Sequence, residues 1–170
     1  MSTGEQNTAI DYMLRTTQQH HVQLSVMADQ KANIMIASTS ILLTFSFANF
    51  KQQNLFWGFL ALFVFAFIAL VLAILAVMPR LHRHQSGSMN PLFFGDFNQL
   101  NLDEYRSVMS DVMETEATTY DALVADIHAL GTTLSDRKYR FLTLSYRVFL
   151  TGILTAGALF VLQTALFYFT

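Results

Sequence analysis

Residues Leu55–Met78 read LFWGFLALFVFAFIALVLAILAVM, and this stretch decides the fold. It contains no charged residue, no proline and no strongly hydrogen-bonding side chain. A helix rises about 1.5 Å per residue, so a helix of this length crosses a hydrocarbon layer of about 30 Å. Helices of soluble proteins seldom stay apolar on all sides for so long. The stretch therefore predicts a transmembrane helix.

The composition of the whole chain agrees with a membrane protein. Hydrophobic residues make up 53% of the 170 residues and charged residues 13%, and the charged residues gather in segments that alternate with apolar ones. The net charge of −2 gives no basis for nucleic-acid binding, and the absence of cysteine excludes disulfides and a cysteine nucleophile. We expect one domain over residues 1–170, inserted through its own spans because the N-terminus lacks a secretory signal.

Residues 9–50 contain neither glycine nor proline and predict one long helix that starts in water and enters the membrane as the first span. In its water-exposed half, residues at alternating steps of three and four form a seam that we expect to pack on another helix. The residues of this predicted seam are Ile10, Met13, Thr17, His20, Leu24 and Met27.

Asp29 and Lys31 lie at the predicted membrane boundary, just before the apolar run of the first span. Residues two apart on a helix do not face each other, so these two side chains are not expected to pair. Each then needs water, a lipid headgroup or a neighbouring helix.

A stripe of small and polar residues follows on one face of the first span: Asn33, Ala37, Ser40, Thr44 and Ala48. Small and polar residues in a span normally face another helix or water, because they gain little from contact with lipid. Two interpretations stay open, namely tight helix packing with interhelical hydrogen bonds and the lining of a water path.

The remaining chain predicts a short turn over residues 49–54, the second span over 55–78, a long helical connection over 79–140 and a third span over 141–169. A helical hairpin or bent helix is expected to begin near Leu102 and to carry its acids on the face opposite the apolar residues that run from Tyr105 to Leu134. In the third span, small residues predict a face for close helix contact. These residues are Thr151, Gly152, Thr155, Ala156 and Gly157.

Lysine and arginine residues near the span ends set the expected orientation. Six of them flank the long connection, namely Arg80, Arg83, Arg137, Lys138, Arg140 and Arg147, whereas Lys51 alone lies in the short turn. The N-terminus and the long connection are therefore expected in the cytoplasm and the C-terminus outside. The predicted fold class is all-α, an integral membrane bundle of three transmembrane helices with a cytoplasmic helical region.

No catalytic motif is present, so we expect no enzyme and no cofactor. The five histidines, His20, His21, His82, His84 and His128, match no recognised zinc spacing, and no metal site is expected. The basic residues near the third span fit two roles, membrane topology or phosphate binding. The aromatic residues Phe93 and Phe94 either seat their loop on the helices or stack on a ligand ring.

Three motifs in the same order carry a family resemblance: LRTTQQHHVQLSVMADQKANIMIASTSILL, PLFFGDFNQLNLDEY and YDALVADIHALGTTLSDRKYRFLTLSYRVFLTG. Together they cover about Leu14 to Gly152, and the chain resembles the transmembrane effector domain of Pycsar-type bacterial antiphage systems. In that family, a cyclase activated by infection makes cyclic UMP or cyclic CMP, and the effector impairs the inner membrane. This chain carries no HD phosphohydrolase domain, so any nucleotide pocket is expected in the cytoplasmic helices or between subunits.

The resemblance implies a homo-oligomeric inner-membrane effector that causes abortive infection, with a cyclic nucleotide from a partner cyclase as its ligand and the lipid bilayer as its target. For sensing, we assign Arg137, Lys138 and Arg140 to the phosphate and Phe93 with Phe94 to the base. Ser40 and Thr44 are assigned to the membrane step. The alternative is an oligomeric scaffold that anchors a separate cytoplasmic protein.

Overall fold

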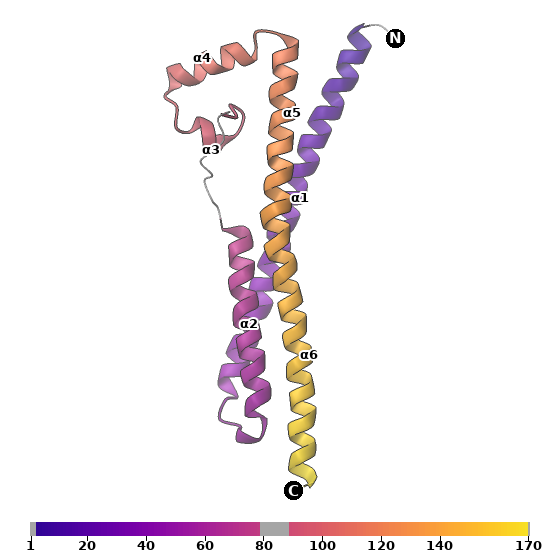
Figure 1. Cartoon of the computed structure of the whole chain (residues 1–170), viewed down its shortest axis with the longest axis vertical. Coiled ribbons are helices and arrows are strands. Elements are labelled where there is room, and N and C mark those ends of the chain that lie inside the picture. Colours follow the sequence, from indigo (N-terminus) through magenta and orange to yellow (C-terminus); the bar gives the residue numbers. More distant parts are fainter. Residues whose placement is uncertain (1–2, 79–88, 170) are drawn as a thin grey trace. The chain divides into compact units, whose positions relative to one another are not determined.

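Helices joined by short turns and loops make up the described residues, which contain no strand, and the predicted all-α class is confirmed (Figure 1). The structure, a computed structural model, describes residues 3–78 and 89–169, without the side chains of residues 3–6, 94, 137, 168 and 169. Three stretches are long and apolar enough to cross a membrane: Asn7–Ala48, Gln53–Val77 and Glu116–Phe167. These stretches correspond to the three predicted spans.

The chain divides into two compact units, each built from two segments. The first unit comprises Met1–Ser25 and Pro79–Leu134, and the second comprises Val26–Met78 and Ser135–Thr170. The long helix α1 (Thr3–Ala48) contributes its first part to one unit and its second part to the other. The sequence predicted that this helix begins near Ala9, but α1 already begins at Thr3.

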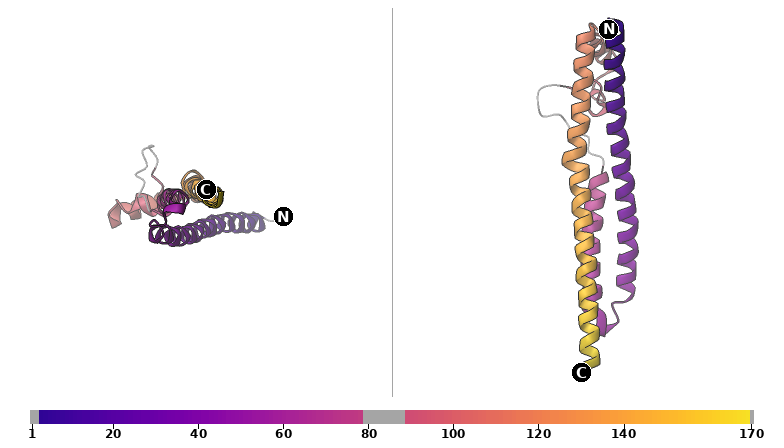
Figure 2. Two further views of the ribbon diagram at one scale, coloured as in Figure 1. Left: turned by 90° about the horizontal axis from the view of Figure 1, so that it is seen from below. Right: turned by 90° about the vertical axis from the view of Figure 1, so that its right-hand side faces the viewer.

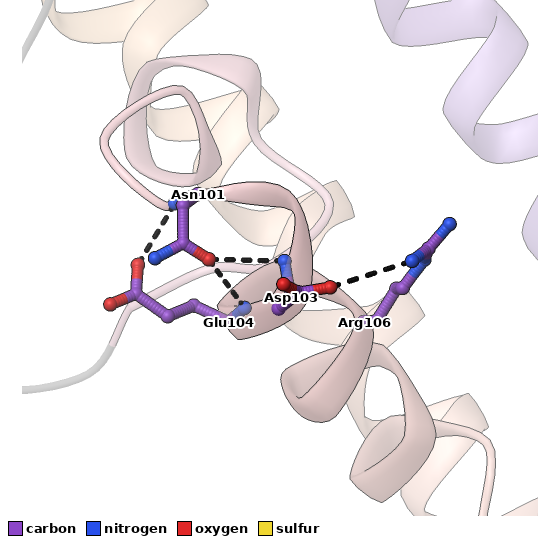
Figure 3. A network of polar contacts seen from close by, with 4 residues as sticks. All are labelled: Asn101, Asp103, Glu104 and Arg106. Carbon is purple, nitrogen blue, oxygen red and sulfur yellow. Dashed lines mark hydrogen bonds and ion pairs between the residues drawn. The ribbon is translucent and has the colours of Figure 1, made fainter.

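The first unit contains three further helices: α3 (Phe94–Phe97), α4 (Leu102–Val112) and α5 (Glu116–Thr133). Helix α4 begins at the predicted Leu102 because Asn101 caps it in a capping box. The Asn101 side chain accepts hydrogen bonds from two backbone N–H groups, and the Glu104 carboxylate accepts one from the Asn101 N–H (Figure 3). Thr115 and Thr118 form a second capping box at the start of α5.

Helices α1 and α5 pair side by side in the first unit. Their bonded residues rise together in number, from Asn7 with Glu116 to Gln18 with Asp126, so the two helices run parallel. The predicted packing seam was confirmed at every second residue, since Ile10, Thr17 and Leu24 are half-buried. Met13, His20 and Met27 from that seam are exposed, whereas Leu14 is buried.

The second unit combines the later part of α1 with the 3₁₀ turn η1 (Gln53–Leu55), α2 (Phe56–Val77), the π-helical segment η2 (Leu134–Tyr139) and α6 (Arg140–Phe169). Helix α2 lies alongside α6 (Figure 2). Large apolar side chains such as Trp57, Phe67 and Leu162 are exposed on this unit. In a membrane-spanning unit such side chains contact lipid, so their exposure is expected.

Small residues bring α2 and α6 close together. The buried face of α2 is rich in alanine and glycine, and a buried glycine of α6, Gly152, lies against Phe65. A Cβ atom placed at Gly152 would come within 2.3 Å of the Phe65 Cβ, so no larger residue fits there. The small-residue face predicted for the third span is confirmed at Gly152 and Ala156, but Thr151 and Gly157 are exposed.

Helix α1 buries a second row of small residues in this unit. The row repeats at steps of three, four and finally seven, which is the spacing of one helix face, and comprises Ala28, Ala32, Thr39 and Ser46 together with the larger Met35. Thr39 and Ser46 are fully buried, and their hydroxyls donate to carbonyls of α1 itself. Next to this row, the Phe45 and Phe59 rings meet edge to face, with centroids 5.8 Å apart.

Candidate functional site

An ion pair at the predicted membrane boundary joins α1 to η2. The Lys138 Nζ lies 2.7 Å from one Asp29 carboxylate oxygen and 2.8 Å from the other. Both side chains are partly exposed, Lys138 at 26% and Asp29 at 42%. Asp29 therefore pairs with a neighbouring helical segment, one of the three environments expected for it. Lys31, the other boundary residue, is exposed.

This pairing bears on the residues predicted to bind phosphate. The Lys138 ammonium already contacts a carboxylate, so an incoming phosphate would have to compete with Asp29. Arg140 is exposed at the first turn of α6. The side chain of Arg137 lies outside the described part, as do Arg80 and Arg83 with their neighbouring histidines. Phosphate binding by this group stays a prediction.

A buried polar cluster ties the first unit together, and sequence patterns missed it. The Asp126 carboxylate accepts hydrogen bonds from the Gln18 amide at 2.7 Å and from the Asn90 amide at 3.1 Å. The Asn90 backbone N–H donates to the Asp96 carboxylate at 2.9 Å. Asp126, Asp96 and Asn90 are all buried.

The acids of α5 were predicted on the face opposite its apolar residues, and for Asp126 this was wrong. Asp126 lies between Leu123, Ile127 and Leu130, which are half-buried on the same side of the helix. An acid inside an otherwise apolar helical stripe was the signal in the sequence, because a buried carboxylate requires partners of its own.

A second polar contact pairs α1 with α5 near its start. The Asp11 carboxylate accepts a hydrogen bond from the Tyr120 hydroxyl and raises the pKa of Tyr120 above its ordinary value of 10.0. Partial burial and then the negative charges of Asp11 and Glu116 raise this pKa further. The neutral phenol is therefore the form that the folded unit favours.

A cavity of about 850 Å³ opens in the first unit between α5, the end of α4 and the loop at residues 89–91. Two carboxylates, Asp111 and Asp121, and one histidine, His128, lie among its lining residues. Neither lysine nor arginine lines it within the described chain, and Phe93 is not part of its wall. The surroundings therefore favour a neutral or cationic group over a phosphate.

Phe93 has a structural contact instead. Its ring covers Gly95, where an added Cβ would approach the ring to 2.5 Å. Nearby, the Phe97 ring packs on Tyr105 with centroids 5.0 Å apart. These contacts fit the loop-seating role among the two considered, while base stacking by Phe93 stays a prediction. The Phe94 side chain lies outside the described residues.

The stripe predicted on the first span is real, but it faces away from the other helices of the chain. Asn33, Ser40 and Thr44 are all exposed, as are Ala37 and Ala48. The Ser40 hydroxyl donates to the Ile36 carbonyl at 2.7 Å, and the Thr44 hydroxyl donates to the Ser40 carbonyl at 3.0 Å. Among the residues that the structure describes, the stripe therefore packs on no other helix.

Two hydrogen bonds cross between α2 and α6 within the second unit. The buried Ser145 hydroxyl donates to the Ala69 carbonyl at 2.7 Å, and the Gln163 side-chain oxygen accepts from the Gly58 N–H at 3.1 Å. Neither residue was singled out in the sequence, since an isolated serine or glutamine in a span has no pattern around it. The bonds fix how α6 is turned toward α2.

Histidine contacts give no metal centre in the described residues. His21 lies beside Gly131, and its Nδ1 is buried without a hydrogen-bond partner. His82 and His84 lie outside the described part of the chain.

The fold and these contacts define a three-span helical membrane protein with a polar helical unit joined to its spans. The Pycsar effector protein domain family matches residues 12–165, and the chain belongs to this family. The family resemblance inferred from the motifs is thereby confirmed, and with it a place among antiphage membrane effectors. Neither curated proteins nor solved structures show a significant match.

Proposed function

We propose that this protein is the membrane effector of a Pycsar antiphage system and that it responds to cyclic UMP or cyclic CMP by impairing the inner membrane. Family membership supports the effector role. The ligand in this proposal is a nucleotide made by a partner cyclase, and the protein itself performs no catalysis. Infection would then end in the death or arrest of the cell before phage matures.

The observation that carries the membrane step is the exposed stripe of α1. Asn33, Ser40 and Thr44 face outward from the chain, and a row of polar side chains on a surface that faces hydrocarbon is unfavourable even though the two hydroxyls donate to carbonyls of α1. Several copies arranged around this face would enclose a polar path. The protein therefore acts as a homo-oligomer whose subunits turn this stripe toward one another.

The orientation follows from the charge distribution. Lys138 and Arg140 lie at one end of the spans and Lys51 lies in the turn at the other, which supports a cytoplasmic first unit and an external C-terminus. A nucleotide made in the cytoplasm then reaches Arg140 at the cytoplasmic end of the spans directly.

For recognition of the nucleotide, the exposed Arg140 and its basic neighbours are the candidates for the phosphate. The cavity lined by Asp111 and Asp121 lacks such a partner in the described residues. Calorimetry should therefore show nucleotide binding that weakens about tenfold in Arg140→Gln. Unchanged binding in this variant would remove Arg140 from the site.

The proposal is tested with the purified protein in vesicles of phosphatidylethanolamine and phosphatidylglycerol that enclose a self-quenched dye. Cyclic UMP or cyclic CMP should release the dye, whereas the linear nucleotides UMP and CMP should not. Absence of release with either cyclic nucleotide, from protein that is correctly inserted and monodisperse before reconstitution, would contradict the proposal and favour a scaffold.

A further inference from the structure

The ion pair between Asp29 and Lys138 restrains an unusual helical segment. Lys138 belongs to η2, which is π-helical over Leu134–Tyr139, while the helices before and after it are α-helical. Isolated π-helical turns inside α-helices are rare and often mark functional positions. Lys138 is the fifth residue of η2, and its ammonium donates to both carboxylate oxygens of Asp29. This contact links α1 directly to η2.

A π-helical turn accommodates one more residue than the α-helical turn that would replace it. Conversion of η2 to regular α-helix would therefore turn all that follows by about 100°, the rotation per residue of an α-helix. Helix α6 follows η2 without interruption. The form of η2 thus sets how α6 is turned about its own axis relative to the residues that precede η2.

That face of α6 is closely matched to α2 in the structure. The Ser145 bond to Ala69 and the close approach of Gly152 to Phe65 both depend on it. A rotation of about 100° would break these contacts and place larger side chains against the alanine row of α2. A turn of this kind in α6 is therefore incompatible with the resting packing of α6 on α2.

We propose that the Asp29–Lys138 ion pair is an autoinhibitory contact, which keeps η2 π-helical and the three spans in their resting packing until the pair opens. The pair is partly exposed, and ion pairs in such surroundings are weak enough to be opened by a competing anion or a shift of α1. Opening lets η2 convert to α-helix and turns α6 away from its resting face. This inference rests on the proposed membrane function.

The first test measures dye release in the vesicles described above without any nucleotide. Asp29→Asn should raise the basal release about fivefold, because the amide is neutral and the restraint is lost. The double variant that combines Asp29→Lys with Lys138→Asp exchanges the two charges and restores the ion pair, so its basal release should return to the wild-type level. Asp103→Asn removes a carboxylate from the exposed Asp103–Arg106 ion pair of α4 and is the matched control, with no change expected (Figure 3).

A second test concerns η2 itself. Deletion of the exposed Ser135 removes the surplus residue, so the segment becomes α-helical while α6 keeps its resting face. Combined with Asp29→Asn, this deletion should return basal release to the wild-type level, whereas Ser135→Ala should leave the Asp29→Asn release unchanged. Continued high release from the deletion variant, with unaltered size-exclusion profile, would overturn the role of η2.

The outcomes also separate this inference from the proposed function. Basal release from Asp29→Asn, without any nucleotide response of the wild-type protein, would support the restraint and contradict nucleotide sensing. If the wild-type protein releases dye in response to nucleotide, but Asp29→Asn without nucleotide releases no more dye than the wild type, the restraint is overturned and the proposed function stays intact. Equal release from Asp29→Asn and from the double variant would also overturn the restraint, since the pair is then irrelevant.

Discussion

The two units use opposite means to join their helices. In the first unit, α1 meets α5 through polar contacts such as Gln18 with Asp126, and Leu14 and Leu134 are its buried hydrophobic residues in the described chain. In the second unit, rows of alanine and glycine let the backbones of α2 and α6 approach closely. In water, apolar burial is the main driving force, so a polar interface separates easily. In lipid, close packing of small residues is what holds helices together.

This difference in helix contacts indicates that the two units have different roles. When an interface held by hydrogen bonds opens, those bonds are exchanged for bonds to water, so it rearranges at a smaller net cost than an apolar core. The spans tolerate little change in packing, so they suit a unit with few discrete arrangements. Mutations in the two units should therefore differ in both size and location of effect.

The largest effect is expected at Gly152 in the second unit. Gly152→Leu places side-chain atoms where the Phe65 Cβ lies, so the unit should lose about 4 kcal/mol or more of stability. Gly157→Leu is the matched control on the same helix, because no atom lies within 4 Å of a Cβ there. Unfolding in mixed detergents would measure both. Equal stability of the two variants would show that close approach of α2 and α6 is unimportant.

The next effect is expected at Asp126 in the first unit. Asp126→Ala leaves the Gln18 and Asn90 amides without their acceptor and should cost about 3 kcal/mol, confined to the first unit. Hydrogen exchange should rise in α5 and the first half of α1 but stay unchanged in α2. The exposed Asp121→Ala is the control and should alter neither. Faster exchange in α2 would contradict the separate stabilisation of the two units.

A smaller effect separates the buried hydroxyl of Ser145 from the other hydroxyls of α6. Ser145→Ala removes a bond to α2 and should cost about 0.6 kcal/mol, a typical value for hydrogen bonds between membrane helices. Thr155→Ala removes a bond within α6 alone and is the comparison. An equal, negligible effect of both variants in detergent unfolding would mean that packing alone fixes α6.

The smallest effect is a pH dependence of the first unit. The raised pKa of Tyr120 means that its contribution to stability is fully present below pH 10 and is lost as the pH rises through the raised value. Hydrogen exchange corrected for its intrinsic pH dependence should show α5 opening more above about pH 10. Tyr120→Phe should lack this change. Identical pH profiles of the two proteins would exclude the Asp11–Tyr120 bond as its cause.

The spans could be predicted from sequence because lipid imposes a simple requirement. Leu55–Met78 has no polar group to satisfy, and a membrane gives such a stretch one solution, a helix. Which faces meet was harder to predict. An alanine row such as Ala28 with Ala32 is apolar enough for lipid and small enough for packing, so composition does not distinguish the two uses.

Errors in the predicted contacts have the same origin. Along α1, one residue position corresponds to about 100°, so the predicted seam was right at Ile10 and Thr17 but wrong at Met13, where the neighbouring Leu14 is buried instead. The polar stripe at Ser40 and Thr44 was identified correctly as a face, yet the residues alone did not say whether that face meets a helix of this chain. Asp126 bonds Gln18, 108 residues away along the chain, and Lys138 bonds Asp29, 109 residues away, and local patterns do not reveal such contacts.

The central claim is that the outward face of α1 performs the membrane step, and nucleotide-triggered dye release from the variant combining Ser40→Leu and Thr44→Leu tests it most directly. Leucine is stable in lipid and excludes water, so release should be abolished while expression and oligomer size stay unchanged. The corresponding double alanine variant should be milder. Retained release from a correctly assembled double leucine variant would contradict the claim and favour general disruption of the bilayer.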